Sequence, residues 1–390
     1  MKRRTQQSGM VAIFVVIFST ILVAIITVSF LRSMIQEEKQ ASNNNLSQSA
    51  YDSAVTGVED GKRVIRAALQ ATGTAQQKAK NAIDNKSCST IADAGIVAMG
   101  SETQIKSNGG VSLQNQAYTC VKITMNTNDV ILNLTEGESV VVPLKAMSSF
   151  NTIDIQWMHR NNSDGGTAYI GGEATDLAAP TSGNYDKLPA KADWNIAAAS
   201  LLRVQSILPT ESSVSLNDLD SSVVTTNFLR PAAATSTAPP FNINLASMRA
   251  TSTNTVTSLN AIACSTTKYK NGNYACNARL SKPDSAMVPS GSNVAYLRLT
   301  SLYRDTSVKI TLAKDNSGSS TSIVQFDGVQ PEIDSTGRAD DVFRRIRSRV
   351  NVGFNGFTFP EYAVDISGNL CKNFYVTPDV ADTIGESCTP

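Results

Sequence analysis

Few residues in this chain have the types and spacing that catalysis needs. Its one histidine, His159, lies in the segment Gln156-Trp157-Met158-His159-Arg160. A Ser-His-Asp triad would have to use it, but no G-x-S-x-G nucleophile elbow occurs. The H-E-x-x-H, Walker A and G-x-G-x-x-G patterns are also absent. A structural or surface role for His159 is therefore favoured, and we expect no enzyme activity and no cofactor.

Two oxygen-rich stretches contain ligands of the kind that Ca²⁺ prefers. They are Asn217-Asp218-Leu219-Asp220 and Asp315-Asn316. Neither has the spacing of an EF-hand, so ordinary turns are favoured and we expect no metal. The acidic pairs Glu37-Glu38 and Glu59-Asp60 fall in a predicted helix, where they indicate a solvated face.

The six cysteines form three pairs of near neighbours. An even number in such groups indicates disulfides formed in an oxidising compartment. Sequence alone permits many pairings, and free buried thiols are the alternative, although no C-x-x-C motif or Cys/His cluster competes for them. The favoured short-loop pairs are Cys88–Cys120, Cys264–Cys276 and Cys371–Cys388.

The N-terminal stretch is the element around which the rest of the chain is expected to be arranged. A basic leader with Lys2, Arg3 and Arg4 ends at Gly9, and the 22 residues of Met10–Leu31 carry no charge. As a helix this run would be roughly 33 Å long, enough to cross the hydrocarbon core of a bilayer. Because the basic residues precede it, the positive-inside rule predicts a cytoplasmic N-terminus and an exported remainder. No A-x-A-like cleavage site closes the run, so we expect a retained single-pass anchor in the cytoplasmic membrane.

The helix is expected to continue over residues 32–72 as a polar, amphipathic segment. Its apolar residues recur at steps near three and four, and no proline occurs before Pro143. Gly57 and Gly61 allow either a bend or a close packing approach. The second half of the helix would pack on the chain's own domain. The first half would lie in the lipid bilayer and later in a polymer. The apolar positions are Leu46, Ala50, Ala54, Val58, Val64, Ile65, Ala68 and Leu69.

This N-terminal arrangement resembles a type IV prepilin. The resemblance rests on the leader that ends in Gly9, the apolar stem, and the small-residue helix of residues 48–59, and it covers about the first 65 residues. It implies that a prepilin peptidase cuts after Gly9 and methylates Met10, and that the apolar helix later enters the core of a pilus. Main pilins carry a glutamate five residues after the cut, where this chain has Phe14. The chain therefore resembles minor pilins of the PilX type and the tip pseudopilin of type II secretion.

The absence of that glutamate has a physical consequence. A charged carboxylate in a bilayer costs about 2.5 kcal/mol or more unless it is paired. In a polymer it would meet the N-terminal amine of a neighbouring subunit. A chain with Phe14 lacks this pairing, and we expect it at a position with no further subunit above it.

Downstream, the period of the apolar residues changes from helical to alternating, which predicts β-strands. Residues 212–240 give few signals of ordered structure, and residues 232–240 are expected to form a loop or linker, while Cys264–Cys276 is expected to close a small hairpin. The loop Cys371–Cys388 matches the placement of the C-terminal disulfide loop that is common in pilins. The expected strands are residues 118–124, 130–134, 139–143, 152–158, 294–303, 308–313 and 322–326.

Residues 340–350 carry four arginines between apolar residues. The solvated face of a strand or short helix is favoured there, and a basic patch for DNA or another anionic polymer is the alternative. The formal net charge of the 390-residue chain is +1, which gives no sign of a nucleic-acid partner. The arginines are Arg344, Arg345, Arg347 and Arg349.

The expected fold class is α+β: a long N-terminal helix packed on a β-rich, pilin-like C-terminal body with an antiparallel sheet. The apolar run and its helical continuation give the boundaries of the first three segments. A boundary after residue 290 divides the rest of the chain into two regions. The expected segments are a leader (1–9), a transmembrane helix (10–31), its amphipathic continuation (32–72), a β-rich extracellular region with loops (73–290) and a C-terminal β-rich, pilin-like region (291–390).

The sequence fits three classes of function to different degrees. The favoured one is a minor pilus subunit, at the tip or in priming, whose partners are other pilin subunits, the prepilin peptidase, the inner-membrane assembly platform, and a host-cell or surface ligand. The alternative is a signal-anchored adhesin or receptor ectodomain that does not enter pili. An anchored extracellular enzyme is the weakest class, since catalytic motifs are absent. The favoured class places the mature chain in a pilus at the cell surface.

Overall fold

The computed structural model of the chain describes residues 8–98, 100, 102–105, 115–159, 194, 199–207, 224–233, 241–244, 259–264, 274–281, 295–314 and 322–352. All of them belong to one compact unit of the chain. The helices are α1 (Ser8–Gln70), α2 (Gly73–Asp84) and α3 (Thr90–Asp93). The strands are β1 (Thr103–Gln104), β2 (Ala117–Thr124), β3 (Asp129–Leu134), β4 (Ser139–Pro143), β5 (Thr152–His159), β6 (Leu201–Ile207), β7 (Val224–Ala233), β8 (Phe241–Asn244), β9 (Leu259–Cys264), β10 (Tyr274–Ser281), β11 (Tyr296–Leu302), β12 (Thr306–Ala313), β13 (Ile323–Val324), β14 (Glu332–Ala339) and β15 (Val342–Arg349).

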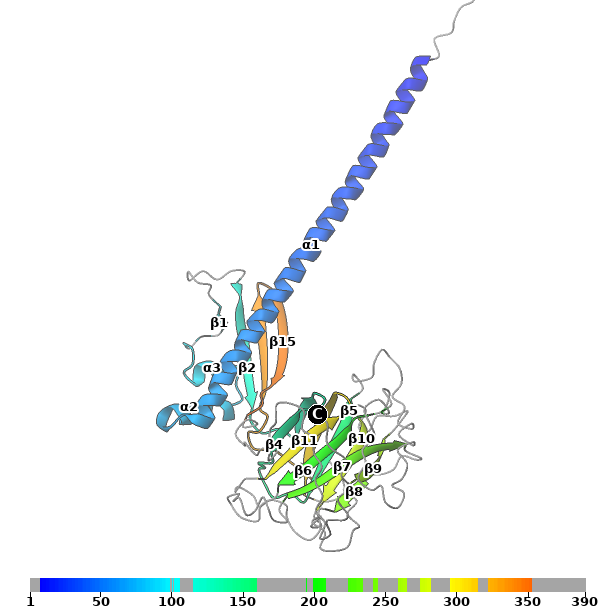
Figure 1. Cartoon of the computed structure of the whole chain (residues 1–390). Coiled ribbons are helices and arrows are strands. Elements are labelled where there is room, and N and C mark those ends of the chain that lie inside the picture. The colour runs from blue at the N-terminus through cyan, green and yellow to red at the C-terminus, as the bar shows by residue number, and fades with distance from the viewer. Residues whose placement is uncertain are drawn as a thin grey trace, which may run out of the picture. The chain divides into compact units, whose positions relative to one another are not determined.

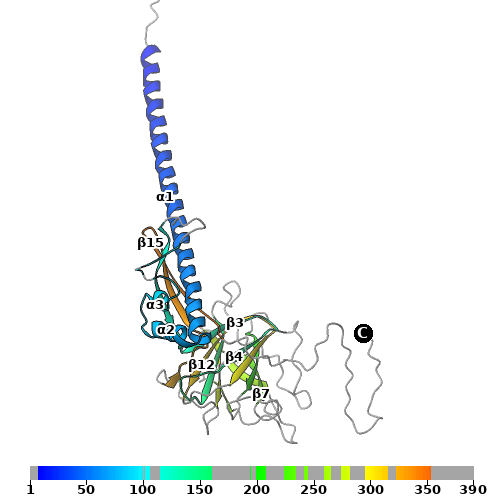
Figure 2. The same cartoon turned by 90° about the vertical axis from the view of Figure 1, so that its left-hand side faces the viewer.

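Helix α1 is one continuous helix of 63 residues, as the long run without proline predicts. Its first half has no other described element beside it in either view of the chain (Figures 1 and 2). Its second half packs on a four-stranded antiparallel sheet with the order β1-β2-β14-β15. The α+β fold class is therefore confirmed.

The packed half of α1 buries the face that the sequence pattern predicts. Six of the eight expected apolar positions are buried, while Leu46 is half-buried and Leu69 is 39% exposed. On the sheet, the buried side chains of β14 alternate with outward ones, as period-two geometry requires. The six buried helix positions are Ala50, Ala54, Val58, Val64, Ile65 and Ala68.

Glycines bring the helix and the sheet unusually close together. A Cβ atom on Gly57 would lie 2.4 Å from Ser335 Oγ, and one on Gly61 would lie 3.0 Å from the Ile333 side chain. On the facing strand, a Cβ atom on Gly337 would lie 2.2 Å from both Ala50 O and the backbone N of Ala54. The glycine pair of the helix therefore serves a close packing approach, one of the two roles expected from the sequence.

Gly337 also marks a change in strand register. The pairing of β14 with β2 shifts between Thr336 and Gly337, where a β-bulge or irregularity interrupts the ladder. An isolated glycine in a strand often marks a bulge or a close backbone approach, and both occur here.

The second sheet has eleven strands in the order β13-β12-β5-β10-β9-β7-β6-β11-β4, with β3 paired to β12 and β8 paired to β10. One hydrophobic cluster takes buried side chains from strands far apart in this order, including β12 and β11. The sheet therefore curls around a single core, in which the fully buried Trp157 donates from Nε1 to Ser200 O at 3.0 Å. Strands that follow residue 290 in the chain contribute to both sheets.

Residues 212–240, which give few signals of ordered structure in the sequence, contain strand β7 over Val224–Ala233, and the loop or linker expected at residues 232–240 lies outside the described residues after its first two. This strand pairs antiparallel with β6 and parallel with β9. Pro231 and the alanines beside it obscured the strand, since both residue types are depleted in sheets. The proline is tolerated next to β6 because that pairing ends at Leu229. The other ambiguous stretch, residues 340–350, is a strand rather than a helix.

We predict that Gly337→Ala lowers the free energy of unfolding of the helix–sheet unit by about 3 kcal/mol or more, because the new methyl group meets helix backbone that cannot rotate away. Urea unfolding in detergent, followed by circular dichroism, measures the change. Gly100→Ala is the matched control, since its Cβ atom would meet nothing closer than Glu102 O at 3.4 Å. Equal stabilities of the two variants would contradict the close approach.

Candidate functional site

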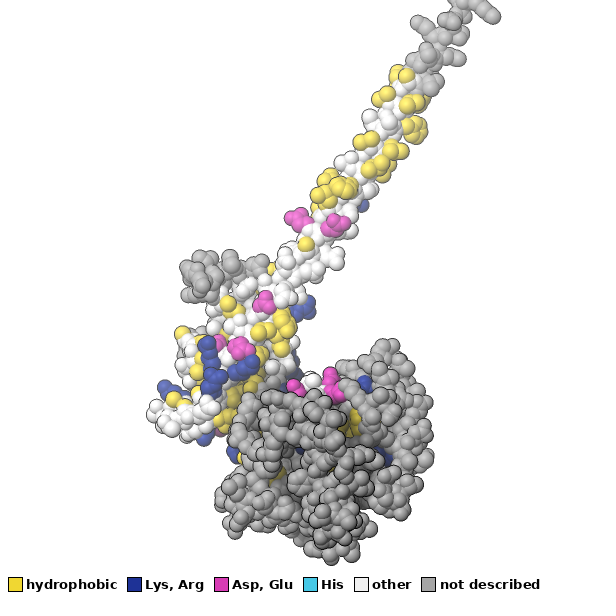
Figure 3. Space-filling view, in the orientation of Figure 1, with side chains coloured by type: hydrophobic (Ala, Val, Ile, Leu, Met, Phe, Trp, Pro, Cys, Tyr) yellow, Lys and Arg dark blue, Asp and Glu magenta, His cyan; other side chains and the backbone are white. Residues whose placement is uncertain are grey.

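The most distinctive surface of the described chain is the first half of α1. Large apolar side chains from Ile13 to Ile35 are each 48–72% exposed, and Phe14 is among them at 56%. Hydrophobic side chains line this half on the side seen in Figure 3, and charged ones appear where the run ends. Contiguous apolar surface of this size marks a contact with lipid or protein.

Three of the four hydroxyl side chains between Met10 and Leu31 donate to carbonyls of their own helix. Ser19 Oγ donates to Val16 O at 2.9 Å, Thr20 Oγ1 donates to Ile17 O at 2.8 Å, and Thr27 Oγ1 donates to Val23 O at 2.8 Å. Each hydroxyl thus uses a carbonyl of its own helix and leaves no free donor towards an apolar medium. These three hydroxyl groups therefore add little to the cost of placing this half of α1 in hydrocarbon.

Within the described residues, α1 is a helix long and apolar enough to cross a membrane. Arg32 is the first charged residue after the run, and Glu37, Glu38 and Lys39 follow it on exposed positions. The charges lie close together at one end of the apolar run, where a helix would leave the hydrocarbon region.

The residues expected to be processed lie at the start of this helix. Gly9 and Met10 belong to the first turn of α1. The orienting residues Lys2, Arg3 and Arg4 lie outside the described residues.

A buried polar contact fixes the second half of α1 to the sheet. Tyr118 of β2 donates from its hydroxyl to Asp60 Oδ2 at 2.8 Å, and Arg63 Nη1 lies 3.0 Å from Asp60 Oδ1. Burial, reinforced by the Asp60 carboxylate, raises the pKa of Tyr118 well above its usual value. The solvated face expected for Glu59-Asp60 is therefore wrong for Asp60, which is buried, and nothing in the sequence indicates that a tyrosine 58 residues away would be its partner.

Two disulfides join near neighbours in the described residues. The structure pairs Cys88 with Cys120 and Cys264 with Cys276, which are two of the three pairs that the sequence favours. The first ties the segment before α3 to β2, and the second joins β9 to β10 at a paired position of the ladder. Cys371 and Cys388 lie outside the described residues.

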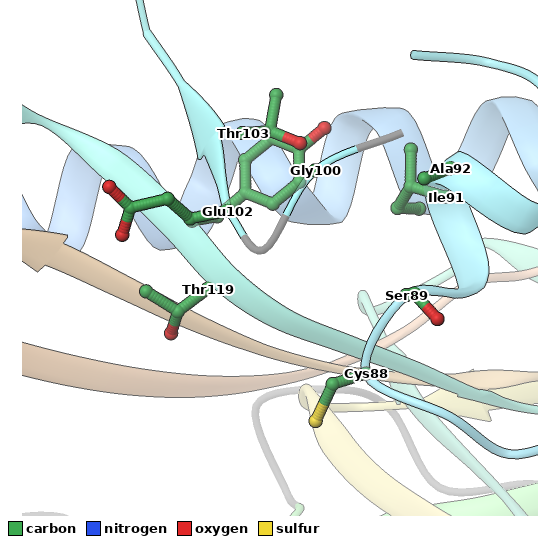
Figure 4. A pocket seen from close by; sticks show the side chains of 9 residues that line it. Cys88, Ser89, Ile91, Ala92, Gly100, Glu102, Thr103 and Thr119 are labelled. Carbon is green, nitrogen blue, oxygen red and sulfur yellow. The ribbon is translucent and has the colours of Figure 1, made fainter. Parts of the chain in front are cut away.

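A hollow of about 200 Å³ lies beside the first disulfide (Figure 4). Ile91 and Ala92 of α3 face Glu102 and Thr119 across it. The carboxylate of Glu102 is engaged by Arg338, whose Nη2 atom donates to Oε1 at 2.6 Å. This acidic group of the hollow is therefore already paired.

Most arginines of β15 face nearby carboxylates. Arg345 binds Asp334 with two hydrogen bonds, one of them 2.6 Å long, and lowers the pKa of that carboxyl. Arg347 Nε lies 3.5 Å from the same group, and Arg349 contacts Asp129 and Glu332 at 3.1 Å each. Arg344 instead donates to Ser47 Oγ of α1 at 2.8 Å. These arginines lie on a charged, largely exposed strand, which agrees with the favoured interpretation of a solvated face.

The other candidate chemical residues give no catalytic arrangement in the part of the chain that the structure describes. His159 is the last residue of β5. The oxygen-rich stretches at residues 217–220 and 315–316 lie outside the described residues. Where residues are described, no group of three or more His, Cys, Asp or Glu side chains is placed to hold a metal.

Comparison with known proteins gives no relative: no family model, no curated protein and no solved structure matches this chain.

We predict that Tyr118→Phe lowers the free energy of unfolding by about 1–3 kcal/mol near neutral pH, because it leaves a buried carboxylate oxygen without its donor. The raised pKa of Tyr118 gives stability that is complete below about pH 10 and is lost as the pH rises towards the folded-state value. The difference between wild type and variant should therefore shrink above pH 10. Urea unfolding in detergent at a series of pH values measures it.

Tyr51→Phe provides the control, since Tyr51 is 49% exposed on the same helix. We expect this variant to change stability by less than about 0.5 kcal/mol. A Tyr118→Phe deficit that stays constant from pH 8 to 11.5 would contradict the raised pKa.

Proposed function

We propose that this chain is a minor subunit of a type IV pilus or related filament, at the tip or in priming. The observation that carries the proposal is the division of α1: an exposed apolar half continues without a break into a half packed on a sheet. A helix of this kind can be held in a bilayer before assembly and among other helices afterwards, because both surroundings are apolar. The leader that ends in Gly9 supplies a processing point at the start of the same helix.

The fold supports this proposal without identifying the family. A long N-terminal helix against a four-stranded antiparallel sheet is the arrangement that the prepilin resemblance implies. The eleven-stranded sheet would be the displayed part, presenting a surface to a host cell or other ligand. In this proposal the pilin-like part would be the helix and the smaller sheet, which takes β14 and β15 from the expected pilin-like region 291–390 and β1 and β2 from residues before it.

The proposed orientation places the leader in the cytoplasm and both sheets outside. Lys2, Arg3 and Arg4 would keep the N-terminus inside by the positive-inside rule, and the two disulfides suit an oxidising exterior. The proposed partners are the prepilin peptidase, the inner-membrane assembly platform, and other pilin subunits through α1. The alternative, a signal-anchored surface binding protein that does not enter filaments, would retain its leader.

We predict that Gly9→Val leaves the full-length precursor in the membrane fraction and removes the chain from sheared surface filaments, because the branched side chain blocks cleavage. Immunoblotting of the two fractions measures the change. Gln7→Val is the control: it places the same side chain in the leader, keeps Gly9, and should leave processing unchanged. Normal processing of Gly9→Val would exclude a prepilin peptidase cut at this position.

The end position in the filament has its own test. Phe14 provides no carboxylate for the N-terminal amine of a neighbour, so we predict that labelled protein occurs at filament ends. Immunogold electron microscopy of intact filaments measures the distribution. Even labelling along their length would contradict an end position while leaving membership of the filament intact.

A further inference from the structure

Strand β15 is an edge of the four-stranded sheet, and among the described residues no strand pairs with its outer side. In the order β1-β2-β14-β15 its ladder partner is β14, and the side chains of Arg345 and Arg347 are 59% and 63% exposed. Phe343, on the same strand, is 55% exposed. An exposed edge of this length offers unpaired backbone groups to another strand.

The hairpin register shows which backbone groups point outward. Ala339 pairs with Val342 across the two-residue turn of Asp340 and Asp341, so this closing pair exchanges hydrogen bonds. Pairs then alternate along an antiparallel ladder between bonded and non-bonded. The N–H and C=O groups that point to the open side therefore belong to Phe343, Arg345, Arg347 and Arg349.

The two faces beside this edge differ in chemistry. The outward face carries Arg345, Arg347 and Arg349, whose neighbouring carboxylates are Asp334, Glu332 and Asp129. Since Asp334 is shared by Arg345 and Arg347, this face retains positive charge near residue 347. The other face, towards α1, carries Val342, Arg344, Ile346 and Ser348, so that two half-buried apolar side chains lie on either side of Arg344, which donates to Ser47 of α1.

Alternate residues of an added strand point to opposite faces of the sheet. A strand on β15 would therefore place every second side chain beside Arg345, Arg347 and Arg349, and the others on the face that carries Val342, Arg344 and Ile346. A second copy of β15 would set like charges against each other, which is unfavourable. A segment in which acidic side chains alternate with apolar ones would set its acidic side chains beside Arg345 and Arg347 and its apolar ones beside Val342 and Ile346.

We propose that β15 is a docking edge for an extended segment of another protein in which acidic side chains alternate with apolar ones. Backbone hydrogen bonds to residues 343–349 would hold the segment, and the arginines would select its charge and register. The inference stands whether or not the chain enters a filament, since it depends on the sheet and not on α1 processing.

The test measures binding of fluorescein-labelled peptides to the full-length protein in detergent by fluorescence anisotropy. The first peptide repeats Glu-Val over eight residues, the second repeats Lys-Val, and the third is the Glu-Val peptide with alternate backbone amides N-methylated. We expect the Glu-Val peptide to bind at least tenfold more tightly than either of the others, because only it has both the charge and the backbone donors.

A pair of variants separates backbone pairing from charge. Arg347→Pro removes an outward N–H and leaves the ladder to β14 intact, while Arg347→Thr removes the same charge and keeps the N–H. We expect the proline variant to lose tenfold or more in affinity and the threonine variant two- to fivefold. Circular dichroism checks that both are folded, and the N-methylated peptide tests the same bond in the wild type if the proline variant is not.

Several outcomes would overturn the proposal. Equal affinities for the Glu-Val and N-methylated peptides would show charge attraction without strand pairing. Displacement of the Glu-Val peptide by an equal concentration of duplex DNA would show a general anion surface. Disulfide cross-linking between copies of Arg347→Cys in the absence of peptide would show that a second copy occupies the edge.

Discussion

The contact of α1 with β14 at Gly337 determines how the rest of the four-stranded sheet is arranged against the helix. Two backbones can approach this closely only where no Cβ atom stands between them, and Gly57, Gly61 and Gly337 meet that condition. Opposite Gly337 the helix presents backbone atoms of the small residues Ala50 and Ala54. The close approach aligns the outer strands as well, since β2 and β15 take their registers from β14. It also fixes the direction in which the unpacked half of the helix leaves the sheet.

This constraint explains why one continuous helix has two different surfaces. The packed half carries glycine, alanine and serine because a sheet lies directly against it, and its one buried acid is held by a tyrosine from that sheet. The first half carries large aliphatic and phenyl side chains because no part of the described chain covers them. Stability of the sheet and availability of the apolar surface are therefore separate properties of the same element.

Much of the structure that α1 forms with the four-stranded sheet could be predicted from the spacing of apolar residues in the sequence. The apolar run, its continuation as an amphipathic helix and the strand at residues 118–124 follow from periods of 3.6 and 2, which are local properties of the chain. The partner of Asp60 and the role of Gly337 could not be predicted, because both depend on residues far away in sequence. In the larger sheet, β7 was missed since Pro231 and its alanines are poor strand formers, and its neighbours β6 and β9 supply the pairing. The arginines of β15 show a similar limit: their spacing indicates a charged face, but only the register reveals that Asp334 serves two of them.

The proposed function joins the leader, the exposed apolar helix and the sheet that holds the helix, and its central claim is that α1 begins, in the mature protein, immediately after Gly9. Mass spectrometry of the N-terminal peptide of the wild-type protein, purified from the cell surface, tests this most directly. The account predicts a peptide that starts at Met10 with a methylated amine. A peptide that starts at Met1 with the leader intact would contradict it.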